Sequence, residues 1–371
     1  MKILLFPTDD RLGQASAISH YTKLGHEIYV PRFGTLGLNW NFISLWPSLL
    51  CKNAAGKINA AAYVSDNKSF GEDLFLDIQG IPQADVGKIP TVNMINENEF
   101  QEIKFDVYHT LRGADSYIEH YESLLKGRKE IAWVSSTMSC YNPLSGAKKS
   151  KNIARIVPAN YQFYDYKTNT VDMFCDDVEY DLFGISRSEE ERIKELASFN
   201  HNYKARQAND YSLFVEMNKI LNDRGMKQVL NHGGNIRKMG ADIRYNENGP
   251  TGNFPTLSPI ENIKKYKKIS GVVHFKANDW GGGVFFHSLH SGTPLITTDR
   301  YVHATRSENY LIDGYNCRII LNAVQAADAV ESLLDYKTFN KLSLGMKEMK
   351  QNIFNETYWD SWKSFLENLL I

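Results

Sequence analysis

The alternation of apolar and polar segments near the N-terminus constrains the fold more than any other feature of this sequence. An apolar run at 3–6 precedes a polar turn, a helix-like segment at 15–24 that Gly25 ends, and a second apolar run at 27–30. Two short strands joined by one helix form a right-handed βαβ unit whose strands are parallel. This pattern predicts an α/β fold.

The same alternation recurs along the chain and predicts two α/β halves. Further strands are expected at FDVYHT (105–110), EIAWVSS (130–136), NIARIVPAN (152–160), KQVLNHG (227–233), GVVHFKA (271–277) and PLITTD (294–299). A chain of 371 residues exceeds the size at which one hydrophobic core keeps growing, so we expect two domains. We place their boundary between 183 and 184, before a charged segment at 188–198 that reads as a helix start with Ser188 as its N-cap. The tail at 356–371 is apolar at helical spacing and is expected to pack on the first domain.

Composition and charge narrow the classes of function. Apolar residues make up 43% of the chain and charged residues 23%, which is typical of a globular protein rather than a disordered one. The formal net charge is −1, so no overall field favours nucleic acid or an anionic membrane as a partner. Two local basic clusters, GAKKSK (146–151) and KKYKK (264–268), leave DNA open as a partner, although such lysines also form ordinary solvated surfaces.

The cysteine pattern predicts a reducing, cytoplasmic setting. Cys51, Cys140, Cys175 and Cys317 are widely separated and form no CxxC pair, which fits free thiols better than disulfides or a zinc site. The apolar N-terminal stretch is too short for a signal peptide, and no run approaches the roughly 18 apolar residues of a membrane span. We therefore expect no transmembrane segment.

A run of three glycines, 281–283, stands before a helix-like segment in NDWGGGVFFHSLHSGTPLITTD (278–299). The free N–H groups and positive dipole end of a helix that begins there would lie beside a loop without side chains, which suits phosphate oxygens. At 3.6 residues per turn, His287 and Ser291 follow Gly283 on one face. The alternative is a tight βα turn followed by ordinary core and surface histidines. A zinc site is disfavoured, because His287 and His290 are three residues apart and no third ligand is evident.

This segment resembles the donor-binding motif of retaining GT-B glycosyltransferases, E-G-F-G-L-x-x-x-E-A-x-A-x-G-x-P-V-I. When the two are registered on Gly292, Pro294 and Ile296, the first Glu falls on Asp279 and the second on His287. In that family the second Glu binds the ribose hydroxyls of the nucleotide. The resemblance implies that the imidazole of His287 takes over this hydrogen bond.

Weaker similarities extend the resemblance over most of the chain. KLGHEIYV (23–30) is similar to the family's G-H-E-V element, and FDVYHT to its D-V-x-H strand end, where the histidine, here His109, faces the donor sugar. The alternative for His109 is a structural histidine whose hydrogen bonds are satisfied. VLNHGGN (229–235) resembles a G-x-G strand end, and NYLIDGYNCRII (309–320) resembles the element E-x-x-x-D-G-x-N-G.

The resemblance also implies where the donor diphosphate is held. FNHNYKARQAND (199–210) occupies the place of the family's basic clamp, with Lys204 before Arg206, although both also fit a solvated charge pair. The N-terminal loop TDDRLGQAS carries only Gly13 where the family often has paired glycines. Its Asp9, Asp10 and Arg11 either orient acceptor hydroxyls or form a plain polar turn.

The implied fold is GT-B, α/β, with two Rossmann-like domains facing across a cleft and a C-terminal helix that crosses back to the first domain. Residues 1–183 and 356–371 form the acceptor-side domain in this scheme, and 184–355 form the nucleotide-sugar-binding domain. The implied catalytic residues are His109, Lys204 and Arg206. The implied donor-binding residues are Gly13, Asn235, Asp279, Gly281, Gly282, Gly283, His287 and Ser291.

The implied activity is transfer of a hexose or pentose from a nucleotide sugar, UDP- or GDP-linked, to an acceptor hydroxyl with retention of configuration and without a metal or cofactor. The acceptor is a saccharide or another hydroxylated molecule, with a modified DNA base as the less favoured option. Three alternatives stay open at this point: a nucleotide-sugar epimerase, a phosphorylase, and a catalytically degenerate binding subunit of the same fold.

Overall fold

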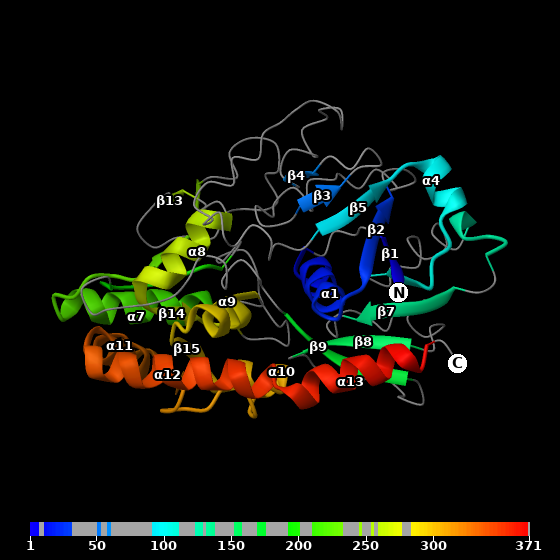
Figure 1. Ribbon diagram of the computed structural model, residues 1–371. Coiled ribbons are helices and arrows are strands. Elements are labelled where there is room, and N and C mark those ends of the chain that lie inside the picture. The colour runs from blue at the N-terminus through cyan, green and yellow to red at the C-terminus, as the bar shows by residue number, and fades with distance from the viewer. Residues whose placement is uncertain are drawn as a thin grey trace. The chain divides into compact units, whose positions relative to one another are not determined.

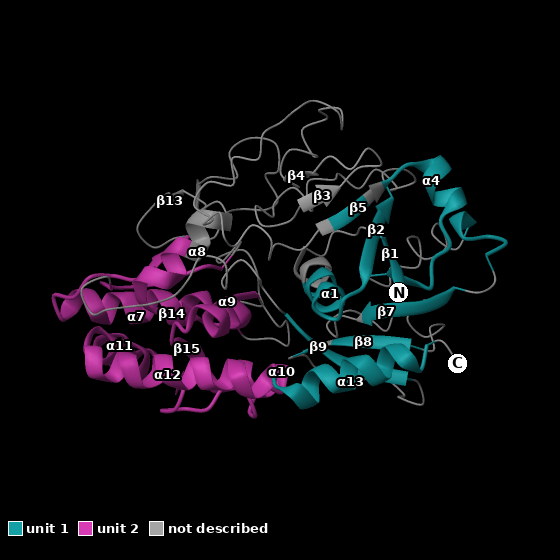
Figure 2. Cartoon of the chain, in the orientation of Figure 1, with its two compact units in different colours: residues 1–157, 161–183, 355–371 teal, residues 158–160, 184–354 magenta. Residues whose placement is uncertain are grey.

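The computed structural model describes most of the chain (Figure 1). The described residues are 1–6, 11–31, 50–52, 58–60, 91–110, 123–128, 131–137, 152–157, 169–175, 192–200, 210–232, 245–246, 254–255, 259–276 and 283–369. The chain divides into two compact units, which Figure 2 shows in different colours. The first unit holds residues 1–157, 161–183 and 355–371, and the second holds 158–160 and 184–354.

The described strands of the first unit form one nine-stranded sheet in the order β4-β3-β5-β2-β1-β6-β7-β8-β9. Their bounds are Lys2–Phe6 (β1), Glu27–Pro31 (β2), Leu50–Lys52 (β3), Ile58–Ala60 (β4), Thr91–Ile95 (β5), Val107–Thr110 (β6), Ala132–Thr137 (β7), Asn152–Val157 (β8) and Asn169–Phe174 (β9). All neighbours are parallel except β3 and β4. Ile3, Leu4, Leu5 and Phe6 of β1 are all buried, as expected for a central parallel strand that is covered on both faces.

The described helices of the first unit are α1 (Arg11–Lys23), α4 (Glu97–Glu102) and α13 (Glu356–Glu367). A capping box fixes the start of α4, because Asn96 and Glu99 each accept a hydrogen bond from the other's backbone N–H. The C-terminal helix α13 packs on β9: the indole of Trp362 is fully buried and donates to the carbonyl of Asp172 at 2.9 Å. The amphipathic tail is therefore part of the first unit's core.

Five described strands of the second unit form a parallel sheet in the order β11-β10-β14-β15-β16. The strands are β10 (Ile193–Ser198), β11 (Leu230–Asn231), β14 (Ile269–His274), β15 (Leu295–Thr298) and β16 (Cys317–Ile320), and a separate short pair consists of β12 (Tyr245–Asn246) and β13 (Phe254–Pro255). The helices within the described part of this unit are α7 (Tyr211–Asp223), α8 (Pro259–Lys268), α9 (Gly283–Ser291), α10 (Asp299–Thr305), α11 (Ala323–Leu334) and α12 (Tyr336–Ile353).

The prediction of a helix in the charged segment at 188–198 is wrong for its second half, because Ile193–Ser198 forms strand β10. Glu195 forms ion pairs with Lys227 and Lys265, which compensate its charge. Leu196, Ala197 and Ser198 are buried. The charges that suggested a helix therefore belong to a strand whose carboxylate has partners from elsewhere in the chain.

The strand order of the second sheet marks a place for a ligand. From β10 the chain first adds β11 on one side and then β14, β15 and β16 on the other. Open parallel sheets bind ligands outside the carboxyl ends of the strands where the order reverses in this way. In this unit that point lies between β10 and β14.

Candidate functional site

The glycine run leads into a helix that begins within one residue of the expected start. Helix α9 starts at Gly283 and directly follows β14 in the order of elements. Val284, Phe285, Phe286 and Leu289 are buried and anchor it to the unit. Its N-terminus, with free N–H groups and the positive dipole end, is thus connected to one of the two strands that flank the reversal of strand order.

The two predicted donor-binding side chains on α9 have different surroundings. His287 is half-buried, and its ring centre lies 5.4 Å from that of Tyr266 on α8. Ser291 is buried and donates to the carbonyl of Ser288 at 3.2 Å, while its hydroxyl also lies 2.7 Å from that of Thr293. The Ser291 hydroxyl is thus engaged at the end of the helix, whereas the His287 ring is partly exposed.

His109 is fully buried on β6 with both ring nitrogens in hydrogen-bond contact. Nδ1 lies 2.8 Å from the hydroxyl of Tyr21 and Nε2 lies 2.6 Å from the hydroxyl of Ser136. Burial, and secondarily the neighbouring His20, lowers the pKa of His109 to about 3. A neutral imidazole has one donor and one acceptor, so this pair of hydroxyls satisfies it. This arrangement is the one expected of a structural histidine with satisfied hydrogen bonds. The catalytic role of His109 stays a prediction.

The structure places the other predicted site residues as follows. Gly13 lies within the first turns of α1, which begins at Arg11, and not in the loop before the helix. The remaining predicted site residues, Lys204, Arg206, Asn235, Asp279, Gly281 and Gly282, lie outside the described residues. Their predicted roles stay predictions. Across the described ranges, no group of histidine, cysteine and carboxylate side chains is arranged to hold a metal ion.

One residue of interest was not recognised in the sequence. His274 is the last residue of β14 and is buried. Its ring makes an edge-on contact with the ring of Tyr301 on α10, with ring centres 5.1 Å apart. Its strand, GVVHFKA, was predicted, but its histidine was not singled out. The signal that drew attention to His109, a histidine at the carboxyl end of a predicted strand, applies equally to His274.

Of the two basic clusters, only the one at 264–268 is described. Lys265 pairs with Glu195, and Tyr266 in the middle of the cluster is fully buried. This cluster therefore contributes to the packing of α8 and is not a continuous charged surface.

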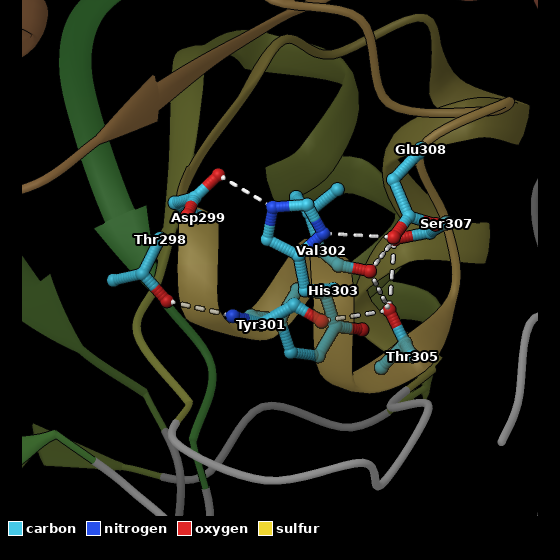
Figure 3. Close-up of polar contacts among 8 residues, drawn as sticks. All are labelled: Thr298, Asp299, Tyr301, Val302, His303, Thr305, Ser307 and Glu308. Atoms are coloured by element: carbon cyan, nitrogen blue, oxygen red, sulfur yellow. Dashed lines mark hydrogen bonds and ion pairs between the residues drawn. The ribbon is translucent and has the colours of Figure 1, made fainter.

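Helix α10 follows β15 and carries an exposed imidazole between two carboxylates (Figure 3). His303 Nε2 lies 3.2 Å from Asp299 Oδ1, and its Nδ1 lies 2.9 Å from Glu308 Oε1. The hydrogen bond to Glu308 and the charge of Asp299 raise the pKa of His303 above its ordinary value of 6.5. The ring thereby links the start of α10 to the segment beyond its left-handed C-cap, Arg306.

This link predicts a pH dependence. Because the folded-state pKa of His303 is raised, its contribution to stability is complete below the unfolded-state pKa and is lost as the pH rises through the folded-state value. At about pH 6 the free energy of unfolding, measured with urea, should be higher for wild type than for His303→Gln. At about pH 9 this difference should be smaller. Removing both carboxylates, as Asn and Gln at 299 and 308, should abolish the trend. A difference that grows with pH would contradict this account.

Comparisons with known proteins support the fold over the whole chain. No family model matches the sequence, and no curated protein matches it. Among solved structures, the chain is similar to HepE of Anabaena in complex with UDP and glucose, with 9% identity, a TM-score of 0.56, and coverage of 99% of this chain and 100% of that one. Sucrose-phosphate synthase from Thermosynechococcus elongatus has 10% identity, a TM-score of 0.56, and coverage of 100% and 99%.

A third solved structure is AviGT4, a glycosyltransferase involved in avilamycin A biosynthesis, with 12% identity, a TM-score of 0.51, and coverage of 100% and 98%. At these identities the similarity shows the fold. Among the described helices, none has the length and apolar character needed to cross a bilayer. The predicted α/β architecture, with a largely parallel sheet in each unit, is confirmed, and the fold matches that of the GT-B glycosyltransferases over the whole chain.

Proposed function

We propose that this protein is a glycosyltransferase that moves a sugar from a nucleotide sugar to an acceptor hydroxyl. The observation that carries the proposal is the similarity of the whole chain, both units included, to HepE, whose structures hold UDP with glucose, and UDP-glucose. Sucrose-phosphate synthase and AviGT4 match over the same extent. The matches include both compact units, so the proposal rests on the whole chain and not on one half of it.

The second unit supplies the features that a nucleotide diphosphate needs. The N-terminus of α9 follows β14 at the reversal of strand order, where its N–H groups suit the phosphate oxygens. Lys204 and Arg206 would stabilise the charge that develops on the leaving diphosphate without a metal. His287, half-buried on α9, would bind the ribose hydroxyls. Asp279, Gly281 to Gly283 and Asn235 complete the proposed donor site.

The finer chemistry belongs to the same proposal. The donor is UDP- or GDP-linked, and transfer proceeds with retention through attack on the face that the diphosphate leaves. The acceptor, a saccharide or another hydroxylated molecule, binds to the first unit, where Gly13 lies in α1. His109 would lie near the reacting sugar. The buried free thiol of Cys317 supports action in the reducing cytoplasm.

Thermal unfolding with UDP, GDP, ADP and CDP, each without metal, tests the donor site. A nucleotide at about 100 times its Kd adds about 2.7 kcal/mol to the state that binds it, so one of the four should raise the midpoint by several degrees. Arg206→Ala should remove the shift, whereas Lys219→Ala, an exposed lysine on α7, should keep it. If none of the four nucleotides shifts the midpoint, the proposal fails and a degenerate binding subunit takes its place.

Turnover then separates transfer from its alternatives. Consumption of the nucleotide sugar should require an acceptor hydroxyl. Donor consumption without an acceptor would indicate an epimerase, and a requirement for free phosphate would indicate a phosphorylase.

A further inference from the structure

His274 occupies a distinctive place in the second unit. It is the last residue of β14, one of the two strands on either side of the strand-order reversal. Val273 and Phe275, its neighbours in sequence, belong to the core shared with α7 and α11. The imidazole of His274 points to the opposite face, because side chains alternate along a strand, and there it meets Tyr301.

The His274 ring lacks hydrogen bonds that a buried imidazole normally makes. The residue is 1% exposed, and within the described part of the chain neither Nδ1 nor Nε2 has a hydrogen-bond partner. An unsatisfied buried polar group costs on the order of 1–3 kcal/mol, and such a group in a native structure calls for an explanation. His109, buried at the end of β6, shows the usual outcome, with a hydroxyl at each nitrogen.

Neighbouring groups hold this unsatisfied ring rigidly. The hydroxyl of Thr297 donates to the His274 carbonyl at 2.9 Å, and the hydroxyl of Thr298 donates to the Lys276 carbonyl at 3.2 Å. Thr298 also caps α10 by accepting from the backbone N–H of Tyr301 (Figure 3). The ring of Tyr301 meets that of His274 at 88°. These bonds hold the backbone on both sides of Phe275, and the ring of Tyr301 packs against the imidazole. A rigidly held, unsatisfied polar group is typical of a preorganised binding residue.

We propose that His274 is a specificity-determining residue, whose imidazole hydrogen-bonds to a sugar hydroxyl of the bound nucleotide sugar. This inference rests on the proposed function and adds a residue and a recognised group to it. The reversal of strand order is where the fold binds its ligand, and the polar group without a partner lies at the end of a strand that flanks it.

The protonation state of the ring selects a hydroxyl over a phosphate. Burial, and then the charge of Lys276, lowers the pKa of His274 well below its ordinary value. The ring is therefore neutral at physiological pH, with one donor and one acceptor. A hydroxyl offers both a donor and an acceptor, whereas a phosphate offers acceptors only and is matched better by a cation.

The test compares wild type with His274→Leu by calorimetric titration with UDP and UDP-glucose, or with GDP and GDP-mannose if guanine nucleotides are the ones that shift the midpoint. Loss of one hydrogen bond in a desolvated site should weaken binding at least about tenfold. Equal weakening for both ligands places the hydroxyl on the ribose. Weakening for the sugar nucleotide alone places it on the transferred sugar. The midpoint of thermal unfolding without ligand should not fall by the amount typical of a core substitution, because the substitution also removes an unsatisfied group.

His290→Leu is the matched control, since His290 is a buried histidine in the same unit, packed against Phe354 at the other end of α9. It should leave both affinities unchanged. Equal affinities in wild type and His274→Leu overturn the inference while the proposed function stands. If wild type binds none of these nucleotides, both fail. Should His274→Leu not fold, imidazole nitrogen NMR shifts of His274 in the wild type decide: a change on adding the sugar nucleotide supports the inference, and no change overturns it.

Discussion

The Gly345→Ala variant is expected to lose much of the stability of the second unit. Gly345 lies inside α12, and a Cβ built on it would lie 2.1 Å from the carbonyl oxygen of Tyr315 and 2.8 Å from the carbonyl carbon. Both atoms are backbone, so no side-chain rotation relieves the overlap. The helix or the turn at Tyr315 must move, at an expected cost of about 3 kcal/mol or more. Intrinsic helix propensity alone would favour alanine by roughly 1 kcal/mol, in the opposite direction.

The turn that meets Gly345 resists such a movement because its own polar groups tie it together. The Asn316 side chain accepts from the N–H of Ile312 at 2.9 Å and donates to the carbonyl of Tyr310 at 2.8 Å. Asp313 accepts from the N–H of Ile319, and Gly314 has φ of +71°. These bonds explain why the sequence carries Asp-Gly and Asn at this spacing. They also leave the turn little freedom to retreat from a new methyl group.

Thermal unfolding measures the effect of Gly345→Ala. A loss of about 3 kcal/mol should lower the midpoint by roughly 6–12 °C in a unit of this size. Leu344→Ala is the control, because Leu344 is the preceding residue of the same helix and its side chain is 48% exposed. Its effect should be much smaller. Equal midpoints for Gly345→Ala and wild type would mean that the turn yields freely.

Local sequence patterns predicted the elements whose signals are complete within a short segment. The apolar run of β1, the start of α9 after the glycines and the amphipathic face of α13 are of this kind. Strand β10 was mistaken for a helix because the partners of Glu195, Lys227 and Lys265, stand 32 and 70 residues away. A charge pattern looks the same whether its charges face water or distant ion-pair partners.

The candidate site was predictable only in part, for a similar reason. A histidine at a strand end identifies a position at the carboxyl edge of a sheet, and both His109 and His274 occupy one. What distinguishes them is the set of neighbours. Tyr21 and Ser136 satisfy His109 from 88 and 27 residues away, while His274 has no corresponding bonds among the described residues. Only the folded arrangement shows which of the two imidazoles is left to bind something else.

Arg192 is a second residue whose importance depends on distant partners. Its buried guanidinium donates to the carbonyls of Leu333 and Leu334 at 3.0 Å each, and to the hydroxyl of Ser270 at 3.2 Å. These carbonyls belong to the last turn of α11. Carbonyls there have no partners within the helix, and the helix dipole favours a cation beside them. The guanidinium carbon also lies 4.9 Å from the ring centre of Phe339 on α12. One side chain thus joins the start of β10 to the junction of two helices.

We expect Arg192→Met to lower the free energy of unfolding of the second unit by about 3 kcal/mol, because it leaves two buried carbonyls and a hydroxyl short of a charged donor. Arg192→Lys should recover only part of this, since one ammonium cannot reproduce the planar fork that reaches both carbonyls. Arg224→Met is the control: its ion pairs with Asp328 and Glu331 are exposed, and such pairs contribute little. Urea unfolding followed by circular dichroism ranks the three variants. An Arg192→Met midpoint no lower than that of Arg224→Met would show that water replaces the guanidinium at the end of α11.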